Sequence, residues 1–251
     1  MNDTINCQLN HRTIRVFKDQ LLSAEIVTTL VNVARHTATS HFLQAFSIIS
    51  VTDPNLKAAI RNISKQAYVG TNGHLFIFIA DQYRDAIIGQ EMGHPENILG
   101  DADRMIAGFS DAILAVQNTV NAAESMGLGA VILGSILNDA QQLIDLLHLP
   151  KLTFPVLGLE IGYPAQQPQL KPRLPEQFVH FENSYQLPTP IVSQLSHYDK
   201  VVHDYYDMRE TNQRVDTFTN QIYKSLTDVP EKRNQLLHTL HQQGFLVADQ
   251  N

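Results

Sequence analysis

Residues 101–134, DADRMIAGFSDAILAVQNTVNAAESMGLGAVILG, form the stretch that decides how the chain folds. The first part predicts one long helix from Asp101 to Met126, closed by Gly127, because glycine readily adopts the left-handed backbone that follows a helix. Its apolar residues point almost all the way round the helix axis: Met105, Ile106, Phe109, Ile113, Leu114, Val116 and Val120. Such a helix must be buried on several sides. Either a monomer core or a subunit interface satisfies that requirement.

Strands and helices alternate on both sides of this stretch. Period-two and continuous apolar runs predict strands at residues 46–51, 74–80, 129–134 and 153–163. Helical spacing predicts helices at 23–38, around 56–63, and at 139–149. A Pro- and Gln-rich connector follows at 165–178, and the rest is helical, at 191–208, 216–226 and 231–243. We expect one domain over 1–251, with an α/β core and a connector and helical extension over 165–251.

Composition excludes several classes of protein. A chain of 251 residues with 43% hydrophobic and 17% charged residues is typical of a soluble globular protein. Its net charge of −7 argues against a nucleic-acid binder. The most apolar run, residues 75–80, is far shorter than the ~20 residues of a membrane helix. Cys7 is the only cysteine, and the N-terminal residues do not resemble a signal peptide. We therefore expect a cytoplasmic protein without membrane or nucleic-acid partners.

Three clusters of cationic side chains stand out in this acidic chain. They consist of Arg12 and Arg15, Lys171 and Arg173, and Arg209 and Arg214. Each cluster alone is typical of a solvated surface. Arginine binds phosphate through paired, charge-assisted hydrogen bonds, so the three clusters together favour a phosphorylated small molecule as ligand. Residue chemistry alone leaves the activity open.

Other local patterns do not develop into sites. Gly127 and Gly129 precede a strand, and Ile132 stands where a dinucleotide fingerprint needs its third glycine. No phosphate loop and no Gly-x-Ser-x-Gly elbow occurs in the sequence, which disfavours a phosphoryl or acyl hydrolase. His238 and His241 have a metal-ligand spacing but lack an obvious third ligand, so we expect no metal site.

The order of several motifs resembles a known family. The chain shows HRTIRVF at residues 11–17, ATSHFLQ at 38–44, SIISVTD at 47–53, AAESMGLG at 122–129, LKPRLP at 170–175 and HFENSY at 180–185. The Asp204-Tyr205-Tyr206 region completes the set. This series resembles the FMN-dependent nitroreductase superfamily, in its NADPH-linked branch of oxygen-insensitive nitroreductases and flavin reductases. The resemblance covers nearly the whole chain.

The resemblance implies an α+β homodimer with two FMN sites at the dimer interface. Each subunit is then a three-layer α/β/α sandwich with a central mixed sheet. The resemblance assigns the FMN phosphate and ribityl chain to His11, Arg12, Thr13 and Arg15. It assigns the isoalloxazine ring to Gln66 and the backbone of Ile132, Leu133, Gly134 and Ser135. It brings Lys171 and Arg173 to the same flavin, and Thr39, Ser40, His41 and Phe42 from the partner subunit.

The resemblance also implies the reaction. Arg209 and Arg214 match the segment that recognises the 2′-phosphate of NADPH, although Val215 replaces a frequent second arginine. The implied activity is ping-pong hydride transfer from NADPH through FMN to nitroaromatics, quinones, free flavin or azo compounds. The flavin carries the chemistry, so no catalytic side chain is assigned. The alternative is a flavin-binding or sensing module without turnover.

Overall fold

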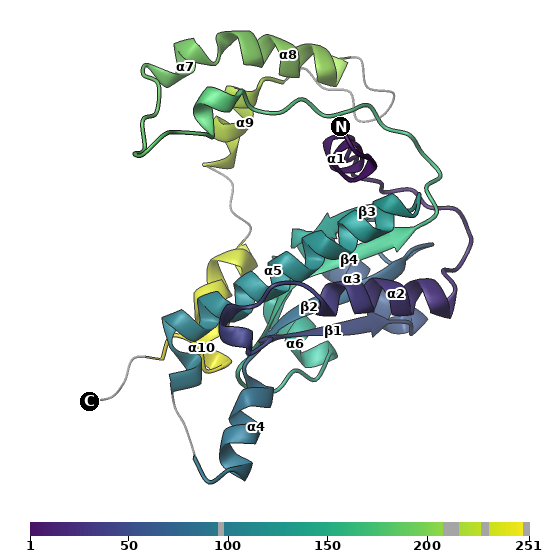
Figure 1. Cartoon of the computed structure of the whole chain (residues 1–251), viewed down its shortest axis with the longest axis vertical. Coiled ribbons are helices and arrows are strands. Elements are labelled where there is room, and N and C mark those ends of the chain that lie inside the picture. Colours follow the sequence, from purple (N-terminus) through teal and green to yellow (C-terminus); the bar gives the residue numbers. More distant parts are fainter. Residues whose placement is uncertain (95–97, 208–215, 227–230, 248–251) are drawn as a thin grey trace. The chain divides into compact units, whose positions relative to one another are not determined.

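A computed structural model of the chain describes residues 1–94, 98–207, 216–226 and 231–247 (Figure 1). The chain divides into two compact units. Unit 1 comprises Met1–Pro168 and Pro230–Asn251, and unit 2 comprises Gln169–Val229. The sequence predicts one continuous C-terminal extension from residue 165. In the structure, the last stretch of that extension belongs to unit 1.

Unit 1 is built on a four-stranded sheet. The strands are β1 (Phe46–Val51), β2 (His74–Asp81), β3 (Gly129–Leu133) and β4 (Thr153–Gly162), in the order β1-β2-β4-β3. All four predicted strands are confirmed, but each neighbouring pair is antiparallel. The parallel pairing expected of a mixed sheet is limited, within the described residues, to the bridge between Thr13 and Ala130. Val51 ends β1 opposite Leu75 of β2, so the helix between them does not carry the chain across the sheet.

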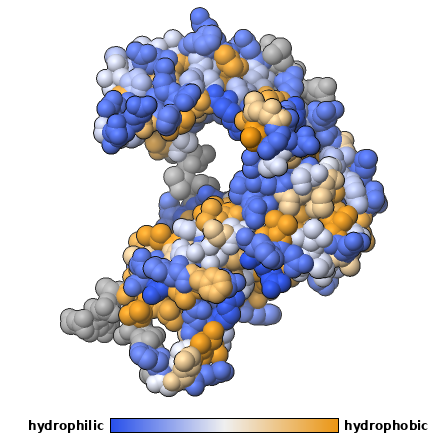
Figure 2. Space-filling view, in the orientation of Figure 1, coloured by the Kyte–Doolittle hydropathy of each residue, from blue (hydrophilic) through white to orange (hydrophobic). Residues whose placement is uncertain are grey.

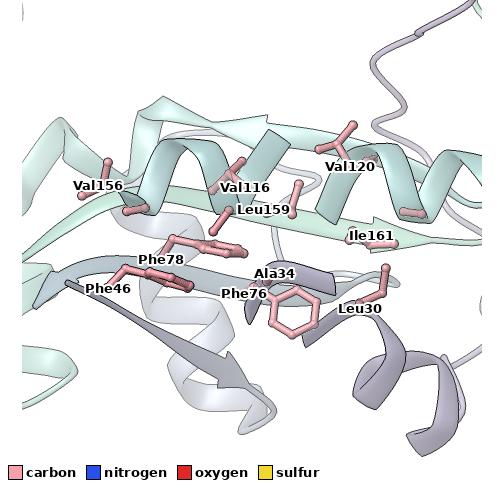
Figure 3. Packing of buried hydrophobic residues seen from close by; sticks show 14 of the residues in the cluster. Leu30, Ala34, Phe46, Phe76, Phe78, Val116, Val120, Val156, Leu159 and Ile161 are labelled. Carbon is pink, nitrogen blue, oxygen red and sulfur yellow. The ribbon is translucent and has the colours of Figure 1, made fainter. Parts of the chain in front are cut away.

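Helices cover both faces of this sheet (Figure 1). On one face lie α2 (Ala24–Arg35) and α5 (Ala102–Ser125), and on the other lie α3 (Pro54–Ser64), η3 (Gly134–Asp139) and α6 (Ala140–Leu146). Alternate side chains of β2 enter the two cores, with Phe76 and Phe78 facing α5 and Leu75 and Ile77 facing α3. Figure 3 shows Val116 and Val120 of α5 over Leu159 and Ile161 of β4. The expected α+β sandwich of three layers is confirmed.

The long helices begin where the sequence predicts them, and a side chain caps each start. The Ser23 hydroxyl accepts a hydrogen bond from the Ile26 amide at 3.2 Å, and the Asp101 carboxylate accepts one from the Arg104 amide at 2.8 Å. Such caps satisfy amides that have no partner within the helix. Gly127 has φ +74°, as predicted for the residue after α5. Two helices escaped prediction, α1 (Asp3–Leu9) and α4 (Tyr83–Glu91), because neither carries a strong apolar stripe.

Unit 2 contains η4 (Glu176–Phe178), α7 (Ile191–Gln194), α8 (Ser196–Asp207) and α9 (Phe218–Ser225). Its small core consists of Phe178, Leu195, Tyr198, Val202 and Tyr206. The sequence predicts a single helix over 191–208, whereas the structure divides it at Leu195. Leu195 is the C-cap residue of α7, and its side chain lies in the core of unit 2.

The C-terminal stretch of unit 1 contains η5 (Glu231–Gln235) and α10 (Leu236–Gln242), where one helix was expected. Phe245, just beyond α10, is fully buried with Phe154 of β4 and Ile144 of α6. Two short 3-10 turns, η1 (Ser40–Phe42) and η2 (Ile98–Gly100), complete the fold. Within the part of the chain described here, no helix has the length and apolarity needed to cross a membrane.

Candidate functional site

The cationic segment at residues 11–15 lies along the edge strand β3. The Ile14 amide donates a hydrogen bond to the Ala130 carbonyl at 2.9 Å, next to the bridge between Thr13 and Ala130. This close approach depends on Gly129, because a Cβ at that position lies 2.7 Å from Cβ of Ile14. Arg15 is exposed, and its neighbour Ile14 is buried. The β3 edge therefore fixes the backbone from which the predicted phosphate ligands project.

His11 and Arg12 are held by contacts of their own. His11 Nδ1 lies 2.6 Å from a carboxylate oxygen of Glu124 at the end of α5. Arg12 donates from Nε to the Pro168 carbonyl at 3.0 Å and from Nη1 to the Asn10 carbonyl at 2.9 Å. Glu124 lies in the quoted AAESMGLG motif, but the sequence gives it no role because its partner is over a hundred residues away. Its contact orients the imidazole and leaves Nε2 facing away from the carboxylate.

A cavity of 660 Å³ in unit 1 adjoins this segment. Its lining combines cationic, acidic, polar and apolar side chains, among them Cys7, Asn10, Arg12, Ile14, Lys18, Glu124 and Gln166. Burial, and then the charge of Glu124, raise the pKa of the Cys7 thiol above its usual value. Cys7 is therefore a protonated wall residue of this cavity, in keeping with the absence of any sequence feature marking it as reactive.

Residues 132–135 form the turn from β3 into η3. Ile132 is exposed, Leu133 is buried, and Gly134 and Ser135 are half-buried. Arg233 of η5 donates to the Gly134 carbonyl, and its Nε donates to the Asn138 side chain at 3.1 Å. Lys232 pairs with Asp139 beside it. The sequence reading missed these cations, because only the tertiary fold brings η5 over η3.

Gln66 lies on the loop between α3 and β2. Lys65 ends α3 in the left-handed conformation, and the amide of exposed Gln66 donates to the Ser64 hydroxyl at 3.2 Å. Further along this loop, the Gly70 amide donates to buried Glu160 of β4 at 3.0 Å. Burial raises the pKa of Glu160 to about 7, while the Gly70 and Gly73 amides, Lys57 and Arg61 act in the opposite direction. The buried carboxyl group of Glu160 thus anchors the loop that carries Gln66.

Residues 39–42 occupy a different part of unit 1. Thr39 and Ser40 are half-buried, whereas His41 and Phe42 are exposed. The Ser40 amide donates to the carboxylate of Asp111 on α5 at 2.8 Å. Asp111 is fully buried and was not singled out in the sequence, where it reads only as one polar residue in an apolar helix.

The remaining predicted residues belong to the second and third cationic clusters. Lys171 and Arg173 line a cavity of 390 Å³ in unit 2, together with Tyr198, Tyr206 and Phe218. Arg209, Arg214 and Val215 lie outside the described residues. The structure therefore brings His11, Arg12, Thr13 and Arg15 together along β3 in unit 1. Lys171 and Arg173 are likewise together, within unit 2.

Known proteins share both the sequence and this fold. Residues 9–163 match the Nitroreductase family, and residues 171–248 match the Nitroreductase family, C-terminal domain. The chain belongs to the nitroreductase family. This nitroreductase is 40% identical over 248 residues to "FMN reductase (NADPH)" of Bacillus subtilis. The match covers 98% of this chain and 99% of that protein. It is 36% identical to "NADPH-dependent oxidoreductase" of Staphylococcus saprophyticus, covering 96% and 97%.

Solved structures agree with the assignment to the nitroreductases. NfrA1 nitroreductase from Bacillus subtilis superposes with a TM-score of 0.91 at 39% identity, covering 97% of this chain and 99% of that chain. NADPH:FMN oxidoreductase from Vibrio harveyi, complexed with NAD⁺, superposes with a TM-score of 0.86 at 31% identity, with the same coverage. The likeness extends over both units of this nitroreductase.

Proposed function

We propose that this nitroreductase is an NADPH-dependent FMN oxidoreductase that passes reducing equivalents to electron-poor acceptors: nitroaromatics, quinones, free flavin and azo compounds. The observation that carries the proposal is the cationic segment at residues 11–15, fixed along β3 by Gly129 and the Ala130 pairing. Relatives named as FMN reductase (NADPH) and NADPH-dependent oxidoreductase support the same activity. A cytoplasmic location is part of the proposal.

The donor set of unit 1 fits the phosphate end of FMN. His11, Arg12, Thr13 and Arg15 supply an imidazole, two guanidinium groups and a hydroxyl along one short backbone segment. Such groups form charge-assisted hydrogen bonds with a phosphate. The β3–η3 turn at 132–135 and Gln66 would line the ring, and Lys171 and Arg173 would add positive charge, which favours an anionic reduced flavin. When bound, FMN supplies the redox chemistry by taking up a hydride from NADPH and reducing the acceptor.

The protein's own residues bind the cofactor and hold its surroundings in place. Cations neutralise the phosphate, Glu124 keeps the His11 ring in one orientation, and Arg233 holds the Gly134 carbonyl. No side chain has to act as nucleophile or general base. Anaerobic addition of NADPH to the FMN-loaded protein tests the proposal, and we expect the flavin absorbance to bleach and to return with a quinone or nitroaromatic. A protein that takes up no FMN on reconstitution would refute it.

Arg209 and Arg214 distinguish this enzyme from a flavin-binding module without turnover, because a mere flavin carrier has no need of a nucleotide phosphate site. We expect Arg209→Ala with Arg214→Ala to raise the KM for NADPH at least ~10-fold, equivalent to about 1.4 kcal/mol. Steady-state kinetics with NADPH and NADH measure this. NADH lacks the 2′-phosphate, so its KM serves as the control, and an unchanged KM for NADPH removes the argument for these two arginines.

A homodimer is also part of the proposal, and α5 offers the surface for it. Ile106 and Ile113 lie seven residues apart on one face of the helix, exposed by 60% and 47% in the single chain, and Leu114 beside them is exposed by 49%. Figure 2 shows hydrophobic patches interrupting the polar surface of unit 1. Contiguous exposed apolar area is typical of a protein interface.

Substitution on this face tests the dimer. We expect Ile113→Arg to convert the protein to monomers and to release FMN, because a charge at the centre of an apolar interface has no partner there. Size-exclusion chromatography with light scattering, read at the flavin absorbance, measures both effects. Ile88→Arg on α4 replaces an isoleucine of similar exposure, 50%, and is the matched control. Loss of the dimer in both variants would contradict the assignment of α5.

A further inference from the structure

Residues 40–45 form a backbone segment in an unusual conformation. His41, Phe42 and Gln44 have φ values of 51°, 61° and 53°, in the left-handed region that favours glycine. Their side chains contain a ring or a long polar chain, so each pays a steric cost for that backbone. Such a conformation persists only when the surrounding structure imposes it. Contacts with the rest of unit 1 must therefore hold the segment in this conformation.

Two of these contacts come from the side chain of Asp111 on α5. One carboxylate oxygen of Asp111 accepts a hydrogen bond from the Ser40 amide at 2.8 Å, and the other accepts one from the Ala45 amide at 3.0 Å. Asp111 is fully buried on α5, so its two oxygens bracket the segment from inside the protein. Charged acceptors form stronger hydrogen bonds with amides than neutral ones do. A single buried side chain thus fixes both ends of the segment.

Neighbouring elements reinforce this clamp. The Arg84 guanidinium of α4 donates to the Gln44 carbonyl, and the Asp81 amide at the end of β2 donates to the Ala45 carbonyl at 3.0 Å. On α5, one turn before Asp111, a Cβ at Gly108 lies 3.1 Å from that same carbonyl. The backbone is consequently held by α4, α5 and β2 together.

The side chains of residues 41–44 lie at the surface of the single chain. His41, Phe42, Leu43 and Gln44 are all exposed in the single chain, and Phe42 is exposed by 83%. Holding a large apolar ring in water, on a strained backbone, gives no stability to the fold. The arrangement presents an aromatic surface in a fixed position, ready for a planar molecule or another chain.

We propose that Asp111 is a positioning residue whose carboxylate holds residues 40–45 so that Phe42 and His41 form one wall of the acceptor site. The inference rests on the proposed function and on the family resemblance, which implies that residues 39–42 reach the flavin of the partner subunit. It goes further by placing control of the wall in the interface helix. Planar aromatic acceptors then bind against a wall that is already ordered, and they lose less affinity to the ordering of flexible groups.

The test compares Asp111→Asn with the wild-type FMN-loaded protein. An amide keeps one accepting oxygen and replaces the other with a donor, so one amide of the segment loses its partner. We expect hydrogen exchange in the peptide covering 39–46 to accelerate at least ~10-fold. We expect the KM for a planar nitroaromatic to rise at least ~5-fold, with the KM for NADPH and the turnover of ferricyanide, a small non-planar acceptor, changed less than ~2-fold.

Two further variants keep the result interpretable. Arg84→Ala removes an exposed contact to the same segment and should act in the same direction even if Asp111→Asn folds poorly. Thr119→Val alters another buried polar residue of α5, whose hydroxyl donates to the Ala115 carbonyl within the helix, and should leave exchange in 39–46 unchanged. A uniform loss of stability with unchanged nitroaromatic KM would mean that Asp111 is only structural.

The outcomes also separate the two proposals. If the wild-type protein takes no electrons from NADPH, the proposed function fails and this inference fails with it. If the wild-type protein turns over and Asp111→Asn keeps the nitroaromatic KM, only the positioning role is overturned. Faster exchange in 39–46 without any change in acceptor KM overturns it as well, because the segment then moves without affecting the acceptor.

Discussion

Replacing His11 and Arg15 together with alanine is expected to weaken FMN binding at least ~100-fold, or about 2.7 kcal/mol. Each side chain would make a charge-assisted hydrogen bond to the phosphate, and such bonds contribute roughly 1.5–3 kcal/mol each. The substitution also leaves the Glu124 carboxylate without its imidazole partner, next to the position proposed for the phosphate. Titration of the apoprotein with FMN, followed by flavin fluorescence, measures the dissociation constant.

Two controls identify the phosphate as the group concerned. Riboflavin has the same ring and ribityl chain but no phosphate, so its affinity should fall far less in the double variant than that of FMN. Arg35→Ala removes an exposed arginine at the end of α2, whose side chain donates to Asn32, and should not change FMN binding. Equal losses for FMN and riboflavin would place the phosphate elsewhere.

Glu160→Gln is expected to stabilise the protein at alkaline pH and to have little effect in acid. Burial raises the pKa of Glu160 to about 7 from an ordinary 4.5, so the folded state holds this proton more tightly than the unfolded state. The resulting stabilisation is complete below pH 4.5 and disappears as the pH rises through 7. Over that window it amounts to about 3 kcal/mol. Glutamine resembles the protonated carboxyl and keeps an oxygen for the Gly70 amide.

Urea unfolding at pH 5 and pH 8.5, with equal excess FMN, measures the free energy of unfolding of both proteins. The advantage of Glu160→Gln should appear at pH 8.5 and shrink at pH 5. Glu25→Gln provides a second carboxyl-to-amide change in unit 1, at an exposed residue of α2 where no comparable stabilisation is expected. An advantage of the same size at both pH values would show that ionisation of Glu160 is not its source.

The sequence predicts the sheet and its long helices because their signals are local. The apolar runs of β1 to β4 lie within the strands they define, and the stop at Gly127 lies directly after the C-cap of α5. The direction of each strand relative to its neighbour depends on contacts that are distant in the sequence, and the expected mixed sheet is antiparallel in its four strands. The short helices α1 and α4 lack a clear apolar stripe, so periodicity does not reveal them.

The candidate site is likewise predicted only where its residues are close together in the sequence. The run His11 to Arg15 is visible as a cluster of cations and as a family motif, and the structure places it along β3. Asp111, Glu124 and Glu160 remain hidden, since each acts on residues 66 or more positions away along the chain. A carboxylate inside an apolar stretch gives no indication of which distant amide or imidazole it meets.

The burial of Phe245 with Phe154 and Ile144 has a consequence for biosynthesis. Unit 1 is assembled from two stretches of chain, with the whole of unit 2 synthesised between them. A chain emerging from the ribosome therefore completes β4 long before the residues that cover Phe154 exist. Contacts of such large sequence separation slow folding, and uncovered apolar surface promotes aggregation. Any sheet that forms in this interval has one end of its core uncovered.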